Sequence, residues 1–87
     1  MNYFLGKIKN ITLSVAQEIM ENEKSFFELQ GIIIENIWQN VDDNKEIYFL
    51  AKIDNIKSTK EFAQKMRAAT LLVTPNASVA ELVYLSN

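Results

Sequence analysis

The sequence predicts a single α+β domain in which four strands and two helices follow one another in the order βαββαβ. A strand-like segment occurs twice, as Tyr-Phe-Leu-Gly-Lys-Ile-Lys-Asn-Ile at 3–11 and as Tyr-Phe-Leu-Ala-Lys-Ile-Asp-Asn-Ile at 48–56, with seven of nine residues identical. A stretch with helical spacing of apolar residues follows each copy, at 14–30 and at 58–73. Between the two halves lies Asp-Asp-Asn at 42–44, a cluster typical of a hairpin turn. Together these signals define the order of the elements.

Length and composition restrict what this chain can be. It has 87 residues, of which 48% are hydrophobic and 23% charged, as is typical of one globular domain. We expect this domain to span residues 1–87, with pseudo-repeat halves at about 1–44 and 45–87. The absence of Cys and His excludes a disulfide scaffold, a thiol nucleophile, a Cys/His zinc site and a Ser-His-Asp triad. The net charge of −2 argues against a nucleic-acid partner.

Local signals mark where the two helices begin and end. Ser14 with Gln17, and Ser58 with Glu61, have the spacing of a capping box at a helix N-terminus. Gly31 suits the left-handed position that follows a helix C-terminus. In the second helix, the spacing places four apolar residues on one face: Phe62, Met66, Ala69 and Val73.

Four strands are expected, at about 2–10, 32–41, 45–54 and 79–86. In the βαββαβ plan they form an antiparallel sheet in the order 4-1-3-2, so the two copies of the repeated segment become its central pair. Both helices then cover one face of the sheet and leave the other face open. This arrangement is the ferredoxin-like fold.

Alternation along the central strands assigns their side chains to the two faces. The helix side receives an apolar set with a small residue at its centre, which suits a closely packed helix: Phe4, Gly6 and Ile8 with Phe49, Ala51 and Ile53. The open face receives the alternate positions: Tyr3, Leu5, Lys7 and Lys9 with Glu46, Tyr48, Leu50 and Lys52.

The edge strands are assigned by the cost of burying charge. An unpaired carboxylate is costly inside a protein, which favours the open face for Glu35 and Glu81. There Lys7 and Lys52 could serve as their partners. The opposite assignment would bring the aromatic residues of the same strands to the open face: Trp38 and Tyr84.

The open face is too apolar to remain in contact with water. Each large apolar side chain, such as Leu5 or Leu50, gains roughly 1.5–3 kcal/mol when it is fully buried. An apolar patch of this kind normally marks an interface or a ligand site. A second copy that packs its sheet against this one closes the patch on itself. We therefore expect a homodimer, and neither a nucleic acid nor a membrane as a partner.

The element plan, the size and the two-faced apolar strands resemble the dimeric α/β-barrel superfamily. This group includes small stress-responsive proteins, antibiotic-biosynthesis monooxygenases and many proteins of unknown function. The resemblance implies a homodimer with a mostly apolar pocket, either between the sheet and the helices or between the two sheets. Some enzymes of this kind use a His, which this chain lacks.

The apolar open face and the paired lysines favour a binding function. We expect a cytoplasmic location, because neither a secretory signal nor a membrane-length apolar run is visible. The expected ligand is a small hydrophobic molecule, such as an acyl chain with a carbonyl or carboxylate head. The residues expected to bind it are Tyr3, Leu5, Lys7, Tyr48, Leu50, Lys52, Trp38 and Tyr84. The sequence predicts no metal site and no cofactor.

Two alternatives stay open. In one, the protein is a cofactor-independent monooxygenase, cyclase or decarboxylase, with Glu35 or Glu81 as the general base and a Tyr or Lys steadying an oxyanion. The favoured interpretation of these carboxylates is that they are surface charges, which keep edge strands from pairing with other chains. In the other alternative, the protein is a purely structural dimerisation module with a solid core.

Overall fold

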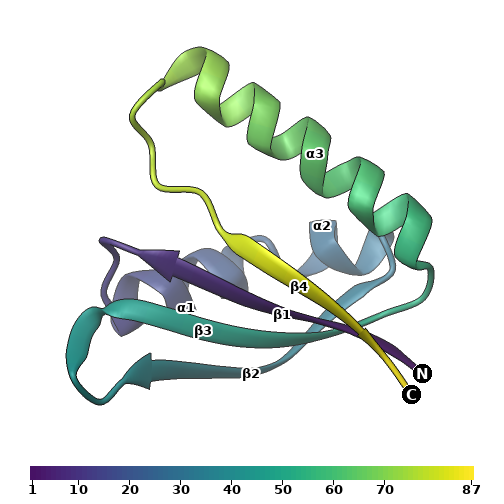
Figure 1. Cartoon of the computed structure of the whole chain (residues 1–87), viewed down its shortest axis with the longest axis horizontal. Coiled ribbons are helices and arrows are strands. Elements are labelled where there is room, and N and C mark those ends of the chain that lie inside the picture. The colour runs from purple at the N-terminus through teal and green to yellow at the C-terminus, as the bar shows by residue number, and fades with distance from the viewer.

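The computed structural model describes residues 1–87 and consists of one four-stranded antiparallel sheet and three helices. The elements are β1 (Asn2–Lys9), α1 (Leu13–Asn22), α2 (Lys24–Leu29), β2 (Ile32–Asn40), β3 (Asp43–Ile53), α3 (Ile56–Val73) and β4 (Glu81–Ser86). The strands lie in the order β2-β3-β1-β4, which is the expected order 4-1-3-2 counted from the opposite edge (Figure 1). The predicted α+β, ferredoxin-like fold is therefore confirmed. No helix combines the length and the apolar character that crossing a membrane requires.

The two copies of the repeated segment form the central strand pair. In the β1–β3 register, Leu5 lies opposite its own counterpart, Leu50. Tyr3 lies opposite Lys52, and Lys7 lies opposite Tyr48, so each copy's tyrosine faces the other copy's lysine. The repeat thus generates a local two-fold relation centred between the two leucines.

The first helical segment is divided into α1 and α2 at Glu23. The division falls in a run of five polar residues, 21–25, none of which can anchor a helix on the apolar sheet. Beyond α2, Gly31 adopts a left-handed φ of 73° and its N–H donates to the carbonyl of Glu28, as expected for a residue after a helix end. A single helix over 14–30 is therefore wrong, whereas its predicted end is right.

The helix caps lie earlier than the capping-box patterns indicated. The Thr12 hydroxyl accepts a hydrogen bond from the backbone N–H of Val15, and the Asn55 side chain accepts one from the N–H of Ser58 at 2.9 Å. Thr and Asn are good N-cap residues in their own right, and each directly precedes the first residue of its helix. Ser14 and Ser58 consequently lie inside the first turns rather than at the caps.

Strand β2 carries an irregularity that changes which side chains share a face. Its register with β3 shifts between Ile34, opposite Ala51, and Asn36, opposite Leu50. Glu35 is the extra residue of this β-bulge. The hairpin that follows turns at residues 41 and 42, slightly before the expected cluster at 42–44.

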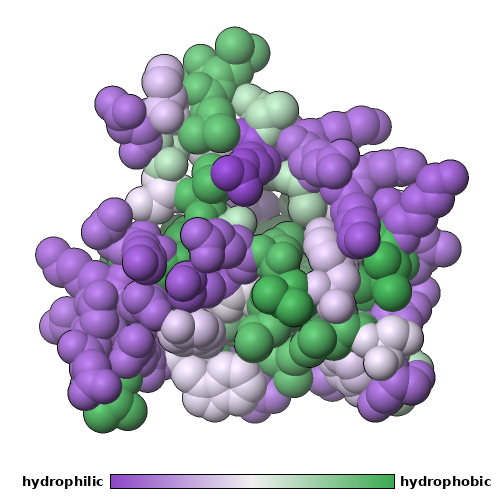
Figure 2. All heavy atoms as spheres, viewed as in Figure 1, coloured by the Kyte–Doolittle hydropathy of each residue, from purple (hydrophilic) through white to green (hydrophobic).

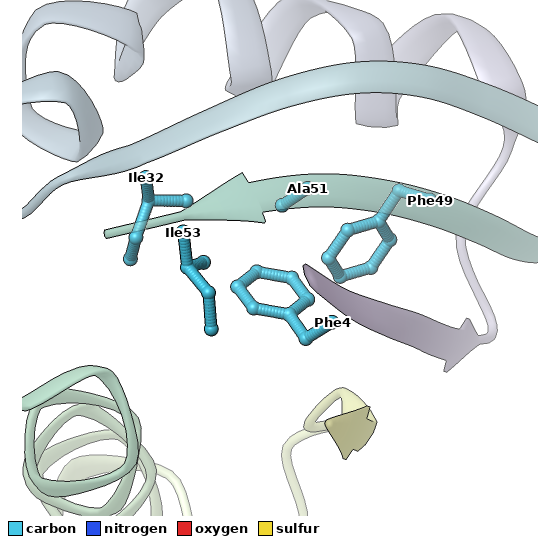
Figure 3. Packing of buried hydrophobic residues seen from close by; sticks show 5 residues of the cluster. All are labelled: Phe4, Ile32, Phe49, Ala51 and Ile53. Carbon is cyan, nitrogen blue, oxygen red and sulfur yellow. The ribbon is translucent and has the colours of Figure 1, made fainter. Parts of the chain in front are cut away.

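The hydrophobic core lies between the sheet and the helices. Five buried residues from three strands form its centre: Phe4, Ile32, Phe49, Ala51 and Ile53 (Figure 3). The Phe4 and Phe49 rings pack edge to face, with centroids 5.9 Å apart. The Phe49 ring lies over Gly6 of the neighbouring strand, so the small residue there accommodates an aromatic ring rather than a helix.

Helix α3 packs loosely on this core. Thr59, near its N-terminus, is its only buried residue, and the helix leans away from the sheet toward its C-terminus (Figure 1). Leu72 and Val73, in its last turn, are 85% and 82% exposed. Apolar surface is visible at this free end in Figure 2.

Candidate ligand-binding site

A cavity of about 310 Å³ lies between α3, α1 and the helix side of the sheet. Sixteen of its twenty lining residues are hydrophobic. The sheet contributes Phe4, Ile8, Ile32, Ile34, Phe49 and Leu82, and α1 contributes Ala16, Ile19 and Met20. The cavity is a cleft that is partly open to solvent, since Ile19 and Met66 of its lining are 47% and 44% exposed. Its volume falls at the lower end of the range for small-molecule sites.

One stripe of α3 forms the roof of this cavity. The residues of the stripe are Thr59, Phe62, Ala63, Met66, Arg67 and Thr70. Their spacing of three and four residues is that of one helix face. Of the apolar face expected for this helix, Phe62 and Met66 line the cavity and Ala69 and Val73 do not. The helix diverges from the sheet before it reaches Val73, which is exposed.

The N-terminal end of α3 is held firmly. The Thr59 hydroxyl donates to the backbone carbonyl of Asn55 at 2.7 Å, and Thr59 is 1% exposed. The Phe62 ring packs against that of Phe26 from α2, with centroids 5.7 Å apart. The cavity is therefore bounded at one end by ordered contacts.

The open face of the sheet is formed by three rows of side chains that run across the four strands. The register places Leu85, Tyr3, Lys52 and Ile33 in one row, Val83, Leu5, Leu50 and Asn36 in the next, and Glu81, Lys7, Tyr48 and Trp38 in the third. No helix covers this face (Figure 1). Several of its apolar side chains are about half exposed: Ile33, Trp38, Val83 and Leu85.

Seven of the eight residues expected to bind a ligand lie together on this open face, and Tyr84 does not. Tyr84 lies opposite Phe4 on the helix side, with ring centroids 6.1 Å apart, and burial raises the pKa of its phenol. Trp38 reaches the open face because the bulge at Glu35 shifts the alternation of β2. The favoured assignment was therefore wrong for Trp38 and right for Tyr84, which it placed on the helix side.

The two glutamates considered as general bases lie away from the cavity. Glu81 is on the open face, as expected, and its carboxylate lies 3.5 Å from the Lys7 ammonium. Glu35 is exposed at the bulge and lines a separate groove beside α1 and α2. It forms no ion pair with Lys52. Neither carboxylate is placed to act on a molecule held beneath α3.

A hydrogen-bonded pair at the end of the open face shows mutual pKa shifts. The Tyr48 hydroxyl donates to the Glu46 carboxylate at 2.5 Å, and the Asn40 amide donates to the same oxygen at 3.3 Å. The Tyr48 hydrogen bond lowers the pKa of Glu46, helped by Asn40, Lys7 and Lys9. The same bond raises the pKa of Tyr48. Both shifts favour a protonated phenol beside an ionised carboxylate.

We predict that Tyr48→Phe raises the pKa of Glu46, because it removes the main cause of the lowered value. The lowered pKa means that this interaction stabilises the fold above the ordinary pKa of Glu and is lost as pH falls through the lowered value. The raised pKa of Tyr48 means that its contribution to stability is lost at the alkaline end, as pH rises through the raised value.

A ¹³C NMR titration of the Glu46 carboxyl measures the change in its pKa on Tyr48→Phe substitution. Tyr3→Phe, on the same face, is the control and should leave Glu46 unchanged, whereas equal pKa values in all three proteins would contradict the prediction.

Sequence reasoning placed the ligand residues on the open face and missed the residues of the cavity. The most informative of these is Arg67, the only Arg of the chain and the only charged residue that lines the cavity. The helical spacing could have indicated its position, since Arg67 lies four residues after Ala63 and eight after Thr59 and therefore shares their helix face. No group of three or more acidic side chains lies close enough together to hold a metal ion.

Two solved structures share this fold over the whole chain. A candidate antibiotic biosynthesis monooxygenase from Deinococcus radiodurans has a TM-score of 0.56 and 10% sequence identity, and the match covers 100% of this chain and 92% of that chain. An uncharacterized NIPSNAP domain protein from Burkholderia xenovorans has a TM-score of 0.54 and 18% identity, with coverage of 100% and 94%. No family model and no curated protein sequence matches the chain. These likenesses confirm the predicted ferredoxin-like fold and concern the fold alone.

Proposed function

We propose that this protein binds a small, mostly apolar molecule in the cavity beneath α3, and that it does so as a homodimer formed through the open face of its sheet. The observation that carries the proposal is the cavity itself, about 310 Å³ bounded almost entirely by hydrophobic side chains. Small-molecule sites are typically concave and lined mostly by hydrophobic side chains, with a few polar groups. A ligand that binds there only in the folded state stabilises the fold.

The alternative of a structural module with a solid core has less support, because the space beneath α3 is not filled by side chains. The enzyme alternative would need an acid or base near the bound molecule, and Glu35 and Glu81 both lie outside the cavity. Binding is therefore the function that the geometry supports best. The cytoplasmic location remains the prediction made from the sequence.

The experiment that tests the binding site uses octan-1-ol as a neutral apolar probe, followed by ¹H–¹⁵N NMR. We expect saturable shifts at cavity residues such as Phe62 and Met66 in the native protein. Ala63→Trp places a large ring in the cavity and should weaken binding about tenfold or more, an effect of about 1.4 kcal/mol. Ala68→Trp is the matched control, since Ala68 is an exposed residue of the same helix that does not line the cavity.

Equal binding by both tryptophan variants, or shifts confined to the open face, would overturn the proposed site. Circular dichroism establishes that each variant is folded. If Ala63→Trp does not fold, Thr70→Phe, at the exposed end of the same stripe, fills the cavity from a more tolerant position.

A further inference from the structure

We infer that the natural ligand of the cavity is an organic acid, with an apolar body beneath α3 and a single anionic group bound by Arg67. This inference rests on the proposed function and adds the chemical class of the ligand. It follows from three features of the cavity: its only charge, the distribution of its polar residues and its volume.

The first feature is the single positive charge of the lining, which is exposed and has apolar residues of the cavity beside it. Arg67 lines the cavity, and no acidic side chain lines it. The one ion pair of the structure joins Lys7 and Glu81 on the other face of the sheet, so Arg67 has no carboxylate partner within the chain. A guanidinium presents a planar fork of donors that matches a carboxylate and binds it with two parallel hydrogen bonds. A bound anion would supply the missing partner.

The second feature is the position of the polar lining residues. Three of the four lie in the second half of α3 or in the segment after it, and the hydroxyl of the fourth, Thr59, donates to the Asn55 carbonyl. Arg67 and Thr70 lie in the second half of α3, where the helix stands farthest from the sheet (Figure 1). Ser78, whose hydroxyl accepts a hydrogen bond from the Asn10 amide, lines the cavity from the segment that leads back to β4. The sheet side is hydrophobic, with the Phe4 and Phe49 rings at its centre. This polarity suits a ligand whose charged group lies under the diverging end of α3 and whose body lies on the sheet.

The third feature is the size of the space. At roughly 30 Å³ for each non-hydrogen atom, which is the share of a water molecule in the liquid, about 310 Å³ holds about ten such atoms. A medium-chain fatty acid such as octanoate, or a short aryl-substituted carboxylic acid, has this size. A long-chain fatty acid exceeds this volume and would extend beyond the cavity.

The experiment compares octanoate with octan-1-ol at neutral pH, so that the two probes share a tail and differ in charge. Native protein should bind octanoate at least about tenfold more tightly than octan-1-ol, because a hydrogen bond to a charged group is among the stronger ones in proteins. Arg67→Gln should abolish this preference, so that octanoate binds no more tightly than octan-1-ol to within about twofold. Lys65→Gln is the matched control, since Lys65 is a cation of the same helix that does not line the cavity, and it should retain the preference.

The outcomes separate this inference from the proposed function. If octan-1-ol binds in the cavity but Arg67→Gln leaves the preference for octanoate intact, or if there is no preference, the organic-acid inference is wrong and the apolar site stands. If Lys65→Gln and Arg67→Gln reduce octanoate binding equally, the effect is one of general surface charge, and the assignment to Arg67 is again wrong. If neither probe shifts cavity residues, the proposed function itself fails. Arg67 is exposed, so thermal unfolding should show that Arg67→Gln keeps the native stability.

Discussion

Replacing Gly6 with alanine is expected to destabilise the fold by about 3 kcal/mol, the upper end of the usual range for overpacking a core. A Cβ atom built on Gly6 would overlap three atoms of the Phe49 ring. The ring cannot move easily, because Phe49 is 8% exposed and packs edge to face against Phe4. Gly6 does not have a left-handed φ, so the cost is steric rather than conformational. Chemical denaturation followed by circular dichroism measures the loss.

A double-mutant cycle identifies the cause. Phe49→Leu removes the ring atoms that the new methyl group would meet, so Gly6→Ala should cost much less in that background than in the native one. Ala51→Gly is the control at the repeat-equivalent position and should cost only about 1 kcal/mol, mainly through backbone entropy. Additive effects of Gly6→Ala and Phe49→Leu, or a loss below about 0.5 kcal/mol for Gly6→Ala alone, would contradict this account.

This strand pair also shows which parts of the fold the sequence could predict. The repeat at 3–11 and 48–56 indicated the central pair, and period-two alternation indicated that Phe4 and Phe49 share a face. Both signals are local and depend only on strand geometry. The sequence could not show that Phe49, rather than a helix, covers Gly6, because that contact depends on the rotamer of a ring on the neighbouring strand.

The edge strand and the cavity show where sequence reasoning stops. The alternation of β2 predicted the wrong face for Trp38, because a one-residue bulge at Glu35 reverses every later side chain. From the sequence alone, Arg67 is an ordinary residue in the middle of a helix. Its proposed contact with a ligand depends on the angle at which α3 leaves the sheet. That angle is a tertiary property and leaves no periodic trace in the sequence.

We expect Leu50→Asp to convert the proposed homodimer to a monomer at micromolar concentration. Leu50 lies opposite Leu5 at the centre of the open face, in the row that also contains Val83. The residues near the centre of an interface contribute most to its stability, and a carboxylate placed there would lose its hydration without gaining a partner. Analytical ultracentrifugation of the native protein and the variant measures the change in mass.

Trp38, the only tryptophan, supplies an independent readout of the same event. It is 47% exposed in a single chain and lies on the open face beside Tyr48, so dimer formation should bury it. Its fluorescence should shift to the red when the native protein is diluted, and the emission of Leu50→Asp should already be shifted at all concentrations. Leu72→Asp is the matched control, because Leu72 is an exposed leucine at the end of α3 and not on the open face.

The outcomes for the dimer are distinct from those for the cavity, because the two surfaces lie on opposite faces of the sheet. A native protein that is monomeric at all concentrations, or a Leu50→Asp variant that remains dimeric, would overturn the role of the open face and leave the cavity standing. If Leu50→Asp does not fold, Val83→Asp tests the same surface from a position that is already 56% exposed. An isologous contact uses the same patch on both protomers, so each substitution acts twice per dimer and its effect on dimer stability is doubled. This doubling makes dissociation the most sensitive test of whether the apolar rows of the open face are covered by a second copy.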